Sequence, residues 1–392
     1  MSETAWKIPL SDIVMDDDEI DAVRDVLVSK WLSMGPVTEE FEAAFARYLG
    51  VKHAFAVSSG TAALHIAHAV LGIGSGDEVI TPSLTFVATA NSVLYCGAKP
   101  VFADIVGTDN LNISWEEIGA RVSPRTRAIT VVHYGGYPCD MQPILEVARD
   151  HDLRVIEDTA HAVGATYKGR KCGTIGDIGC FSFFANKNLS TGEGGMVVTD
   201  DDKLAEKIKV LRSHGMTTMT WDRHRGHGYS YDVTDLGYNY RISEVASALG
   251  IVQLRRLKQN NARRKRIADR YRKALEGTEG IGCPFGGRID GESSHHIFPV
   301  VLSRDLPRAE LQAEMKKRGI QTSIHYPPIH LFTYYRRLFG DTRGSLLKTE
   351  FIGEHEMTLP LYPGMTEEGV DCICTAIDEV TPAILAEKKV SR

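Results

Sequence analysis

Short apolar runs alternate with amphipathic stretches along the first two-thirds of this chain. Runs rich in β-branched and apolar residues predict strands at Ala54–Ser58, Glu78–Thr81, Pro100–Ala103, Ala128–His133, Arg154–Asp158, Gly179–Phe184 and Gly195–Thr199. Helical periodicity between them predicts helices, for example at Thr61–Leu71, Thr85–Tyr95 and Met141–His151. This alternation indicates a mainly parallel sheet that is covered by helices on both faces. The last two strands lie too close in sequence for a helix to connect them, so we expect one of them to be antiparallel.

The rest of the chain predicts one long helix and then a smaller lobe. Apolar residues recur at helical spacing from about Ile242 to Leu275, and His296–Leu302 and Thr322–His325 read as strands beyond that helix. We therefore expect an α/β protein with a large domain over residues 1–250 and a small C-terminal α/β domain over residues 251–392. Ligands of open α/β sheets bind at the carboxyl ends of the strands, so candidate chemistry is expected there.

Composition narrows the class of protein. Of the 392 residues, 43% are hydrophobic and 24% are charged, as in an average globular protein. The net charge of -6 argues against a nucleic-acid partner, because phosphate binding needs a basic excess. The chain contains no apolar run long enough to cross a bilayer, and its acidic N-terminal segment does not resemble a signal peptide. We expect no membrane partner and a cytoplasmic location.

The cysteines predict neither disulfides nor a metal site. There are seven, an odd number without framework spacing, which favours reduced thiols. Cys372 and Cys374 lie close together, but no second pair of Cys or His residues stands at zinc-site spacing.

The first candidate segment follows the first predicted strand. Ser58-Ser59-Gly60-Thr61 ends that strand and opens a helix. The free amides and the dipole of a helix start form an anion site, and a glycine allows a phosphate to approach the backbone. An ordinary helix cap made by Ser or Thr explains the same residues, so this segment alone does not decide between the two.

The second candidate segment is an apolar strand that ends in the acids Glu157 and Asp158. A carboxylate at a strand end can pair with a protonated heterocyclic nitrogen. Pyridoxal phosphate requires such a partner, because its protonated pyridine ring is the electron sink. A solvated strand end or a helix cap remains the alternative.

The third candidate segment is Phe181-Ser-Phe-Phe-Ala-Asn-Lys-Asn-Leu-Ser-Thr-Gly-Glu-Gly-Gly195, in which a buried strand with Ser182 leads into a short loop with Lys187. Desolvation on such a loop lowers the pKa of a lysine and makes it a nucleophilic amine. A surface lysine is the alternative. The order of the three segments, which are an anion site, an acid and a lysine, favours the functional interpretation.

These motifs are numerous and ordered. The chain resembles the DegT/DnrJ/EryC1/StrS family of pyridoxal-phosphate-dependent sugar aminotransferases nearly from end to end. The resemblance rests on Gly35-Pro36, Phe41-Glu42, SSGTAAL, GDEVITPSLTFVATAN, GAKPVFADI, IEDTAHAVGATYKG, FSFFANKNLSTGEGG and GYNYRISEVASALG. It implies the fold-type I aminotransferase architecture and pyridoxal 5'-phosphate as cofactor, with pyridoxamine phosphate as the intermediate form.

The resemblance also implies roles for single residues. Lys187 would form the Schiff base with the cofactor and shuttle protons, and Asp158 would pair with the pyridine nitrogen. The remaining cofactor contacts would come from His161 near the ring 3-hydroxyl, Phe86 stacked on the ring, Ser182, Gly60 and Thr61 at the phosphate, and Asn239 at the phosphate of a neighbouring subunit. The last contact implies a homodimer with shared active sites. The resemblance leaves open whether Arg241 is structural or faces the substrate.

Two differences within the family bear on the reaction. Many members carry Gln at the position of His161, which affects cofactor tuning and leaves the reaction unchanged. The sugar dehydratases of the family replace the lysine with histidine, so Lys187 favours transamination. The predicted function is therefore transfer of an amino group from L-glutamate to a 3-keto or 4-keto sugar nucleotide in amino-sugar biosynthesis. A cyclitol ketone acceptor, a sugar dehydratase and a regulatory protein on the same scaffold are the alternatives.

Four further segments carry polar residues whose roles were also considered. His325, in the segment His325-Tyr-Pro-Pro-Ile-His-Leu331, and Tyr229, in a polar aromatic stretch, are candidate substrate residues. His65 and His68 lie three apart on one helix without a third ligand, so we expect exposed histidines. Arg263–Arg266 is expected to be a solvated face of the long helix, with a diphosphate-binding patch as the alternative.

Overall fold

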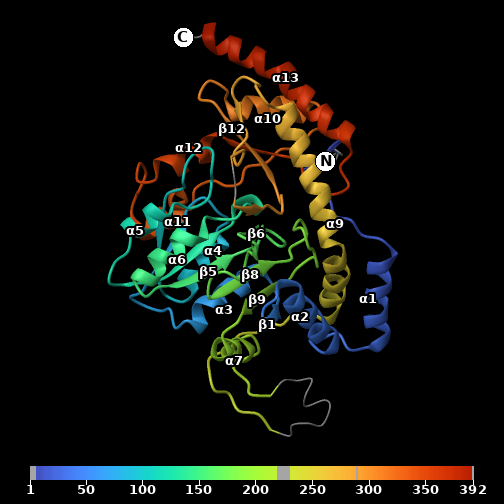
Figure 1. Cartoon of the computed structure of the whole chain (residues 1–392), viewed down its shortest axis with the longest axis vertical. Helices are drawn as coiled ribbons and strands as arrows, with labels where there is room; N and C mark the ends of the chain where they lie inside the picture. Colours follow the sequence, from blue (N-terminus) through green and yellow to red (C-terminus); the bar gives the residue numbers. More distant parts are fainter. Residues whose placement is uncertain (1–5, 219–229, 288–289, 391–392) are drawn as a thin grey trace.

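A seven-stranded sheet forms the centre of the larger lobe. The structure is a computed structural model that describes residues 6–218, 230–287 and 290–390. The strand order is β1-β9-β8-β5-β4-β2-β3 (Figure 1). The bounds are β1 His53–Val57, β2 Glu78–Pro82, β3 Lys99–Ala103, β4 Thr126–Val132, β5 Arg154–Asp158, β8 Ile178–Ser182 and β9 Gly195–Thr199.

The pairing agrees with the predicted, mainly parallel sheet. Strands β3, β2, β4, β5 and β8 pair in parallel, whereas β9 is antiparallel to both β8 and β1. The prediction that one of the last two strands is antiparallel is therefore confirmed. The loop from β8 to β9 reverses the chain without a crossover helix, so that it stays at the carboxyl edge of β8. Lys187 lies in this loop.

Helices cover both faces of this sheet. One face carries α2, α5, α6 and α9, and the other carries α3, α4 and α7. Their bounds are α1 Asp17–Ser29, α2 Pro36–Leu49, α3 Gly60–Val70, α4 Ala88–Tyr95, α5 Trp115–Ala120, α6 Met141–Asp150, α7 Asp202–Leu211 and α9 Glu244–Ala274, with the 3-10 helix η1 at Tyr134–Gly136. Phe41 and Phe45 of α2 pack on Phe181, in β8, and on Phe183, just after β8 on the path to Lys187.

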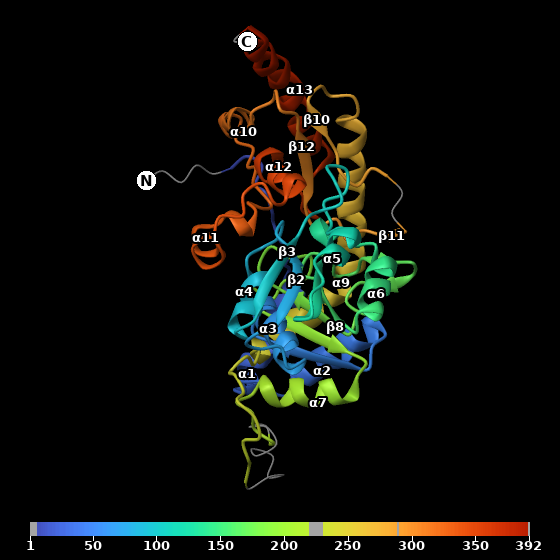
Figure 2. The same ribbon diagram turned by 90° about the vertical axis from the view of Figure 1, so that its left-hand side faces the viewer.

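The smaller lobe is built on an antiparallel sheet of order β10-β12-β13. Its elements are β10 Ile281–Gly282, β12 Phe298–Leu302, β13 Glu356–Leu359, α10 Arg308–Lys317, η2 Ile329–Leu331, α11 Thr333–Phe339, α12 Leu347–His355 and α13 Glu367–Val390 (Figure 2). A third sheet joins β11 Gly291–Glu292, β6 Thr166–Tyr167 and β7 Arg170–Lys171. The strand expected at Thr322–His325 is wrong, because only an isolated bridge from Ser323 to Thr358 forms there.

Helix α9 joins the two lobes. It runs without a break for 31 residues from beside the large sheet to the small one (Figure 1). Its first part packs on α2, while Ile267, Ala268 and Tyr271 lie in the core of the small lobe. The division predicted at residue 250 falls inside this helix, and it stays a prediction.

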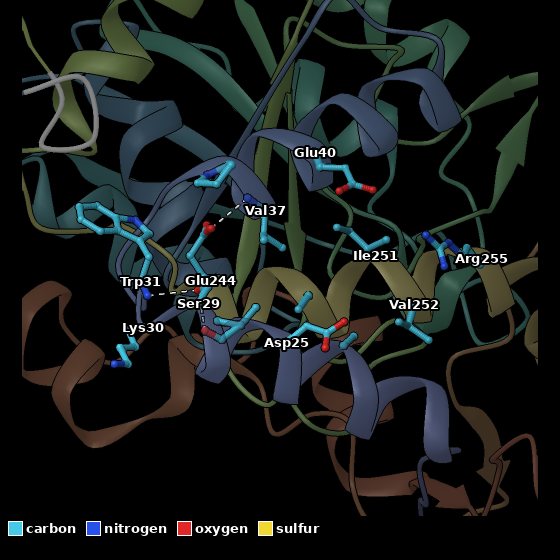
Figure 3. A pocket seen from close by; sticks show the side chains of 14 residues that line it. Asp25, Ser29, Lys30, Trp31, Val37, Glu40, Glu244, Ile251, Val252 and Arg255 are labelled. Atoms are coloured by element: carbon cyan, nitrogen blue, oxygen red, sulfur yellow. Dashed lines mark hydrogen bonds between the residues drawn. The ribbon is translucent and has the colours of Figure 1, made fainter. Parts of the chain in front are cut away.

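Glu244, at the start of α9, caps the start of α2. Its Oε1 accepts hydrogen bonds from the amides of Gly35 and Thr38 at 2.8 and 2.9 Å, and its Oε2 accepts one from Val37 at 2.9 Å. The buried carboxylate thus satisfies the amides that a helix start leaves free, and it does so from another helix. Figure 3 shows Glu244 at the wall of a cavity of about 720 Å³ between α1, α2 and α9.

Two expectations about exposed residues are wrong. His65 and His68 are buried, because α3 lies between the sheet and the aromatic residues near Tyr240. His68 donates from Nδ1 to the carbonyl of Leu64 and accepts at Nε2 from the hydroxyl of Thr130.

Arg264 is also buried, although Arg263–Arg266 was expected to be a solvated face. Its guanidinium donates to the carbonyls of His296 and Leu361 at 3.1 and 2.8 Å, which ties α9 to the small lobe. Burial lowers the pKa of Arg264 to about 9.

Among the described residues, no helix is long and apolar enough to cross a membrane.

Candidate active site

The predicted segments meet at one edge of the large sheet. Strands β1, β5 and β8 run in the same direction, so their carboxyl ends lie at the same edge. The segments that follow them carry Gly60, Asp158, His161, Ser182 and Lys187. The contacts described below bring these five residues into one site.

Lys187 is held on a closed loop. Its amide donates to the carbonyl of Phe184 at 2.9 Å, and Thr191 returns to Phe183 with another 2.9 Å hydrogen bond. The next residue, Asn188, is buried and donates to the carbonyl of Ser294 at 2.8 Å and to Asn261 at 2.9 Å. These bonds anchor both sides of the lysine to the scaffold, which limits the positions that its amine can reach.

The amine of Lys187 is activated by its surroundings. Burial lowers the pKa of Lys187 to about 8, while the negative charge of Asp158 acts in the opposite direction. With this value about one amine in ten is neutral at pH 7, against about one in 2,500 for an ordinary lysine. The side chain is partly buried rather than at the free surface. A surface lysine, the alternative interpretation, does not fit this environment.

Asp158 is a buried carboxylate at the end of β5. Its Oδ2 accepts a hydrogen bond of 2.8 Å from the hydroxyl of Thr89, and its Oδ1 accepts one of 3.1 Å from the amide of Ala160. Burial raises the pKa of Asp158, whereas Thr89, Ala160 and the positive charge of Lys187 lower it. A cationic nitrogen placed beside this carboxylate would gain an ionic partner with little competition from water.

The neighbouring acid, Glu157, belongs to the opposite face of the strand, because side chains alternate along a strand. It accepts hydrogen bonds from His133 at 2.9 Å and from the amides of Gly173, Ile175 and Gly176 at 2.8, 2.6 and 2.7 Å. Glu157 therefore closes a buried turn, and only Asp158 is directed to the site.

The start of α3 and the end of β8 together form a candidate phosphate cradle. At Gly60, the first residue of α3, an added Cβ would lie 2.7 Å from Cβ of Ser182 and 3.1 Å from its Oγ. The helix start and the strand end therefore touch, with the hydroxyl of Ser182 beside the first turn. Gly60 and Thr61 supply amides that the helix itself does not use, while Ser59 caps the amide of Ala62 at 3.1 Å. The cap and the anion site coexist.

Phe86 provides an open aromatic face. Its side chain is 57% exposed although it lies inside the site, with its ring centroid 6.1 Å from that of Tyr326. An exposed aromatic ring, a buried carboxylate, a nucleophilic amine and a phosphate cradle are the donor set that a phosphorylated pyridine aldehyde requires. The residues of this site therefore fit pyridoxal phosphate.

His161 is a neutral imidazole between the two lobes. Its Nδ1 accepts a hydrogen bond of 3.3 Å from the amide of Gly135, and its Nε2 lies 3.0 Å from the hydroxyl of Tyr326. The ring of His296 lies against it, with centroids 4.4 Å apart. Burial and the positive charge of Lys187 lower the pKa of His161 well below its usual value.

The contacts of the other predicted residues lie outside the group formed by Lys187, Asp158 and His161. His325 is half-buried, and its Nδ1 pairs with the hydroxyl of Thr358 at 2.8 Å. Arg241 donates to Ser213 at 3.1 Å, which is a structural contact, and its backbone pairs with Val57. Asn239 is exposed. Tyr229 lies outside the described residues.

Thr89 and Tyr326 are parts of the site that the sequence analysis did not single out. Thr89 follows Phe86 by three residues, and its amide donates to the carbonyl of Phe86 at 3.2 Å across the turn that leads into α4, so their closeness in sequence was a usable signal. Tyr326 stands next to His325, and nothing in the local pattern distinguishes which of the two reaches the site.

Among residues 6–218, 230–287 and 290–390, no group of three His, Cys, Asp or Glu side chains is arranged to hold a metal ion.

Known proteins match this chain over nearly its whole length. A model of the DegT/DnrJ/EryC1/StrS aminotransferase family matches residues 14–378. The spore coat polysaccharide biosynthesis protein SpsC of Bacillus subtilis is 43% identical over 378 residues, which cover 95% of this chain and 97% of SpsC. GDP-perosamine synthase of Caulobacter vibrioides is 41% identical, covering 93% of this chain and 96% of its own.

Solved structures with a similar fold were also found. The PMP form of Spr1654 from Streptococcus pneumoniae has a TM-score of 0.91 at 30% identity, over 96% of this chain and 100% of that one. The PLP form of the same protein has a TM-score of 0.89.

Proposed function

Because this chain belongs to the DegT/DnrJ/EryC1/StrS aminotransferase family and is thus a pyridoxal-phosphate-dependent transaminase of fold type I, we propose that it transfers an amino group from L-glutamate to a keto-sugar carried by a nucleotide. One observation carries the proposal most directly. Strands β5 and β8 are adjacent and parallel, and at their shared carboxyl edge β5 ends in the buried carboxylate of Asp158 while β8 leads into the loop that carries Lys187.

The proposed division of labour follows from the geometry. Bound pyridoxal phosphate supplies an aldehyde that bonds to amines and a ring that accepts the electron pair left on a substrate carbon. Lys187 would hold the cofactor by its amine and, once the donor had freed that amine, would take a proton from the donor α-carbon and later deliver one to the sugar carbon. Asp158 would stay ionised beside the ring nitrogen and keep that nitrogen protonated.

The remaining residues orient the cofactor. We assign Gly60, Thr61 and Ser182 to the phosphate, because the helix amides and the hydroxyl converge there. Phe86 would cover one face of the ring, and His161 would lie beside it as a neutral hydrogen-bonding group. None of these residues moves a proton in the proposal; they hold the ring so that Lys187 and Asp158 reach the correct atoms.

A homodimer is part of the proposal. The site is open beside Phe86, and Asn239 is exposed on the segment that pairs with Ser213. An exposed amide there can reach the phosphate of a second copy, which would complete two sites at one interface. Sedimentation of the purified protein tests this, and an active monomer would contradict it. The expected cytoplasmic location stays a prediction.

The relatives support a sugar acceptor. One of them is named for GDP-perosamine, which is an amino sugar on a nucleotide, and another for a coat polysaccharide. These are the names of other proteins, so the sugar, the nucleotide and the aminated carbon are left to the assay. The candidate carriers are UDP, dTDP and GDP, with the ketone at C3 or C4.

The decisive experiment is amination with labelled donor. Purified enzyme with pyridoxal phosphate is incubated with ¹⁵N-labelled L-glutamate and each keto-sugar nucleotide, and the products are analysed by mass spectrometry. We expect ¹⁵N in the sugar of at least one nucleotide and release of 2-oxoglutarate. Labelling of a cyclitol ketone alone would replace the acceptor, and loss of water without glutamate would indicate the dehydratase.

Lys187→Ala is the matched control. It should abolish labelling, because both proton transfers lose their base. A Lys187→Ala variant that aminates at the normal rate would overturn the assignment of the site. A wild-type protein that binds no chromophore would favour the regulatory alternative.

A further inference from the structure

Tyr326 reaches the site from the small lobe. It lies between α10 and η2, and its hydroxyl is 3.0 Å from Nε2 of His161, which follows β5 of the large lobe. The two rings are close to parallel, with centroids 6.0 Å apart and an interplanar angle of 23°. The ring of Phe86 also lies near Tyr326, with centroids 6.1 Å apart. Tyr326 is therefore a neighbour of two of the residues assigned to the cofactor.

The hydrogen bonds of His161 define where its proton lies. Nδ1 accepts from the amide of Gly135, because an amide nitrogen is only a donor. The neutral imidazole must then carry its hydrogen on Nε2 and donate it to the hydroxyl oxygen of Tyr326. The hydrogen of the Tyr326 hydroxyl is not used in this contact, so it is available to a further acceptor.

The backbone that carries Tyr326 is fixed by β13. The amide of His325 donates to Oε2 of the buried Glu356 at 2.7 Å, and the imidazole of His325 pairs with Thr358 at 2.8 Å. The carbonyl of His325 accepts the hydroxyl hydrogen of Tyr134. The amide, the carbonyl and Nδ1 of His325 are thus engaged, which presents the next residue, Tyr326, to the site.

We propose that Tyr326 is a positioning residue for transamination, whose hydroxyl oxygen accepts the Nε2 hydrogen of His161 and holds that imidazole in one tautomer and one orientation beside the cofactor. This inference rests on the proposed role of His161 as a cofactor contact. It assigns to the segment after α10 a function in the site that does not require His325 to touch the substrate.

The hydrogen bond to Gly135 alone is a weak restraint, because 3.3 Å is at the long end of the usual range. Without the Tyr326 hydroxyl, the Nε2–H group of His161 would be a buried donor without a partner. The imidazole would then lower its free energy by rotating or by changing tautomer. The effect on cofactor affinity should be about 2–10-fold, which is the usual contribution of one neutral hydrogen bond.

Tyr326→Phe is the test, because it removes the hydroxyl and keeps the ring. Tyr335→Phe is the matched control, since its hydroxyl also makes one hydrogen bond in a buried place, to Asn91 at 2.7 Å. The first measurement is the ¹⁵N spectrum of histidine-labelled protein without cofactor, with the signal of His161 assigned by its loss in His161→Gln. The second is the affinity for pyridoxal phosphate by absorbance titration.

In the wild type and in Tyr335→Phe we expect His161 with its hydrogen on Nε2. In Tyr326→Phe we expect averaged nitrogen shifts and a pyridoxal phosphate affinity that is about 2–10-fold weaker. In a His161→Gln background, Tyr326→Phe should change the pyridoxal phosphate affinity by a different factor than it does in the wild-type background, because the two side chains are in contact.

A wild-type protein with the hydrogen of His161 on Nδ1 would overturn the proposal, and this measurement requires no variant to fold. An unchanged tautomer and an unchanged affinity in folded Tyr326→Phe would also overturn it. Failure of the labelling assay would instead remove the proposed sugar acceptor and leave the tautomer result intact. The two failures are therefore distinguishable.

Discussion

The hydroxyl of Thr89 donates a 2.8 Å hydrogen bond to Oδ2 of Asp158, and both side chains are buried. Thr89 lies on α4 and Asp158 at the end of β5, so the contact links a helix to the carboxylate that we assign to the cofactor nitrogen. The hydroxyl of Thr85 lies 3.1 Å from that of Thr89 and extends the same row of polar groups. Thr89 therefore controls both the direction and the charge of Asp158.

Thr89→Val should lower kcat/KM about tenfold, which corresponds to the loss of one hydrogen bond to a charged group. Since the Thr89 hydroxyl lowers the pKa of Asp158, its removal should raise that pKa and shift the acid limb of the pH–rate profile to higher pH. Ser92→Ala is the control, because its hydroxyl bonds to the carbonyl of Thr89 within the same helix. An unchanged acid limb in Thr89→Val would contradict this role.

Capture of pyridoxal phosphate should depend on pH through Lys187. The reactive form is the neutral amine, so the rate of chromophore formation should rise with pH and level off above about 8, the lowered pKa of Lys187. Asp158→Asn removes the negative charge that raises this pKa, so the inflection should move to lower pH. Stopped-flow absorbance of the cofactor-free protein measures both. An inflection near the value of an ordinary lysine, about 10.4, would show that the amine is solvated.

Gly60→Ala should weaken pyridoxal phosphate binding by tenfold or more, an estimate of about 1.4 kcal/mol. The new Cβ would lie 2.7 Å from Cβ of Ser182, so α3 and β8 must separate at the cradle. Gly74→Ala is the control, because its Cβ would meet only the carbonyl of Cys96 at 3.9 Å. The affinity follows from fluorescence titration. If Gly60→Ala binds as tightly as Gly74→Ala does, the phosphate lies elsewhere.

Glu244→Gln should lower the free energy of unfolding by about 1–3 kcal/mol, because one oxygen that accepts helix amides becomes an NH₂ group. The side chain holds the amides of Gly35, Val37 and Thr38. Glu40→Gln, an exposed residue on the wall of the same cavity, should change stability by less than about 0.5 kcal/mol. Urea unfolding of the two variants gives the comparison, and equal midpoints would mean that the cap contributes nothing.

Local patterns were sufficient to predict the strands that carry the chemistry. The bounds of β5 and β9 match the predicted ranges, and the loop with Lys187 follows β8 as expected. The information is local there, because a buried strand and its terminal polar residue are adjacent in sequence. The same holds for Gly60 at the start of α3.

Contacts between distant parts of the chain were not predictable in this way. Tyr326 meets His161 across 165 positions, and Glu244 caps a helix that begins more than two hundred residues earlier. The burial of His65, His68 and Arg264 has the same origin. Their neighbours come from other elements, and a single helical pattern does not report which elements pack against it.

The unbroken course of α9 sets a mechanical limit on the enzyme. A 31-residue helix extends about 45 Å, and here it serves as a common strut for both sheets. Because this single helix packs in the core of each lobe, a wide opening between the lobes would require breaking backbone hydrogen bonds of α9 or removing the helix from one of the two cores. Substrate entry should therefore depend on movements of the peripheral segments, and acceptor choice should evolve through them while α9 and Lys187 stay as they are.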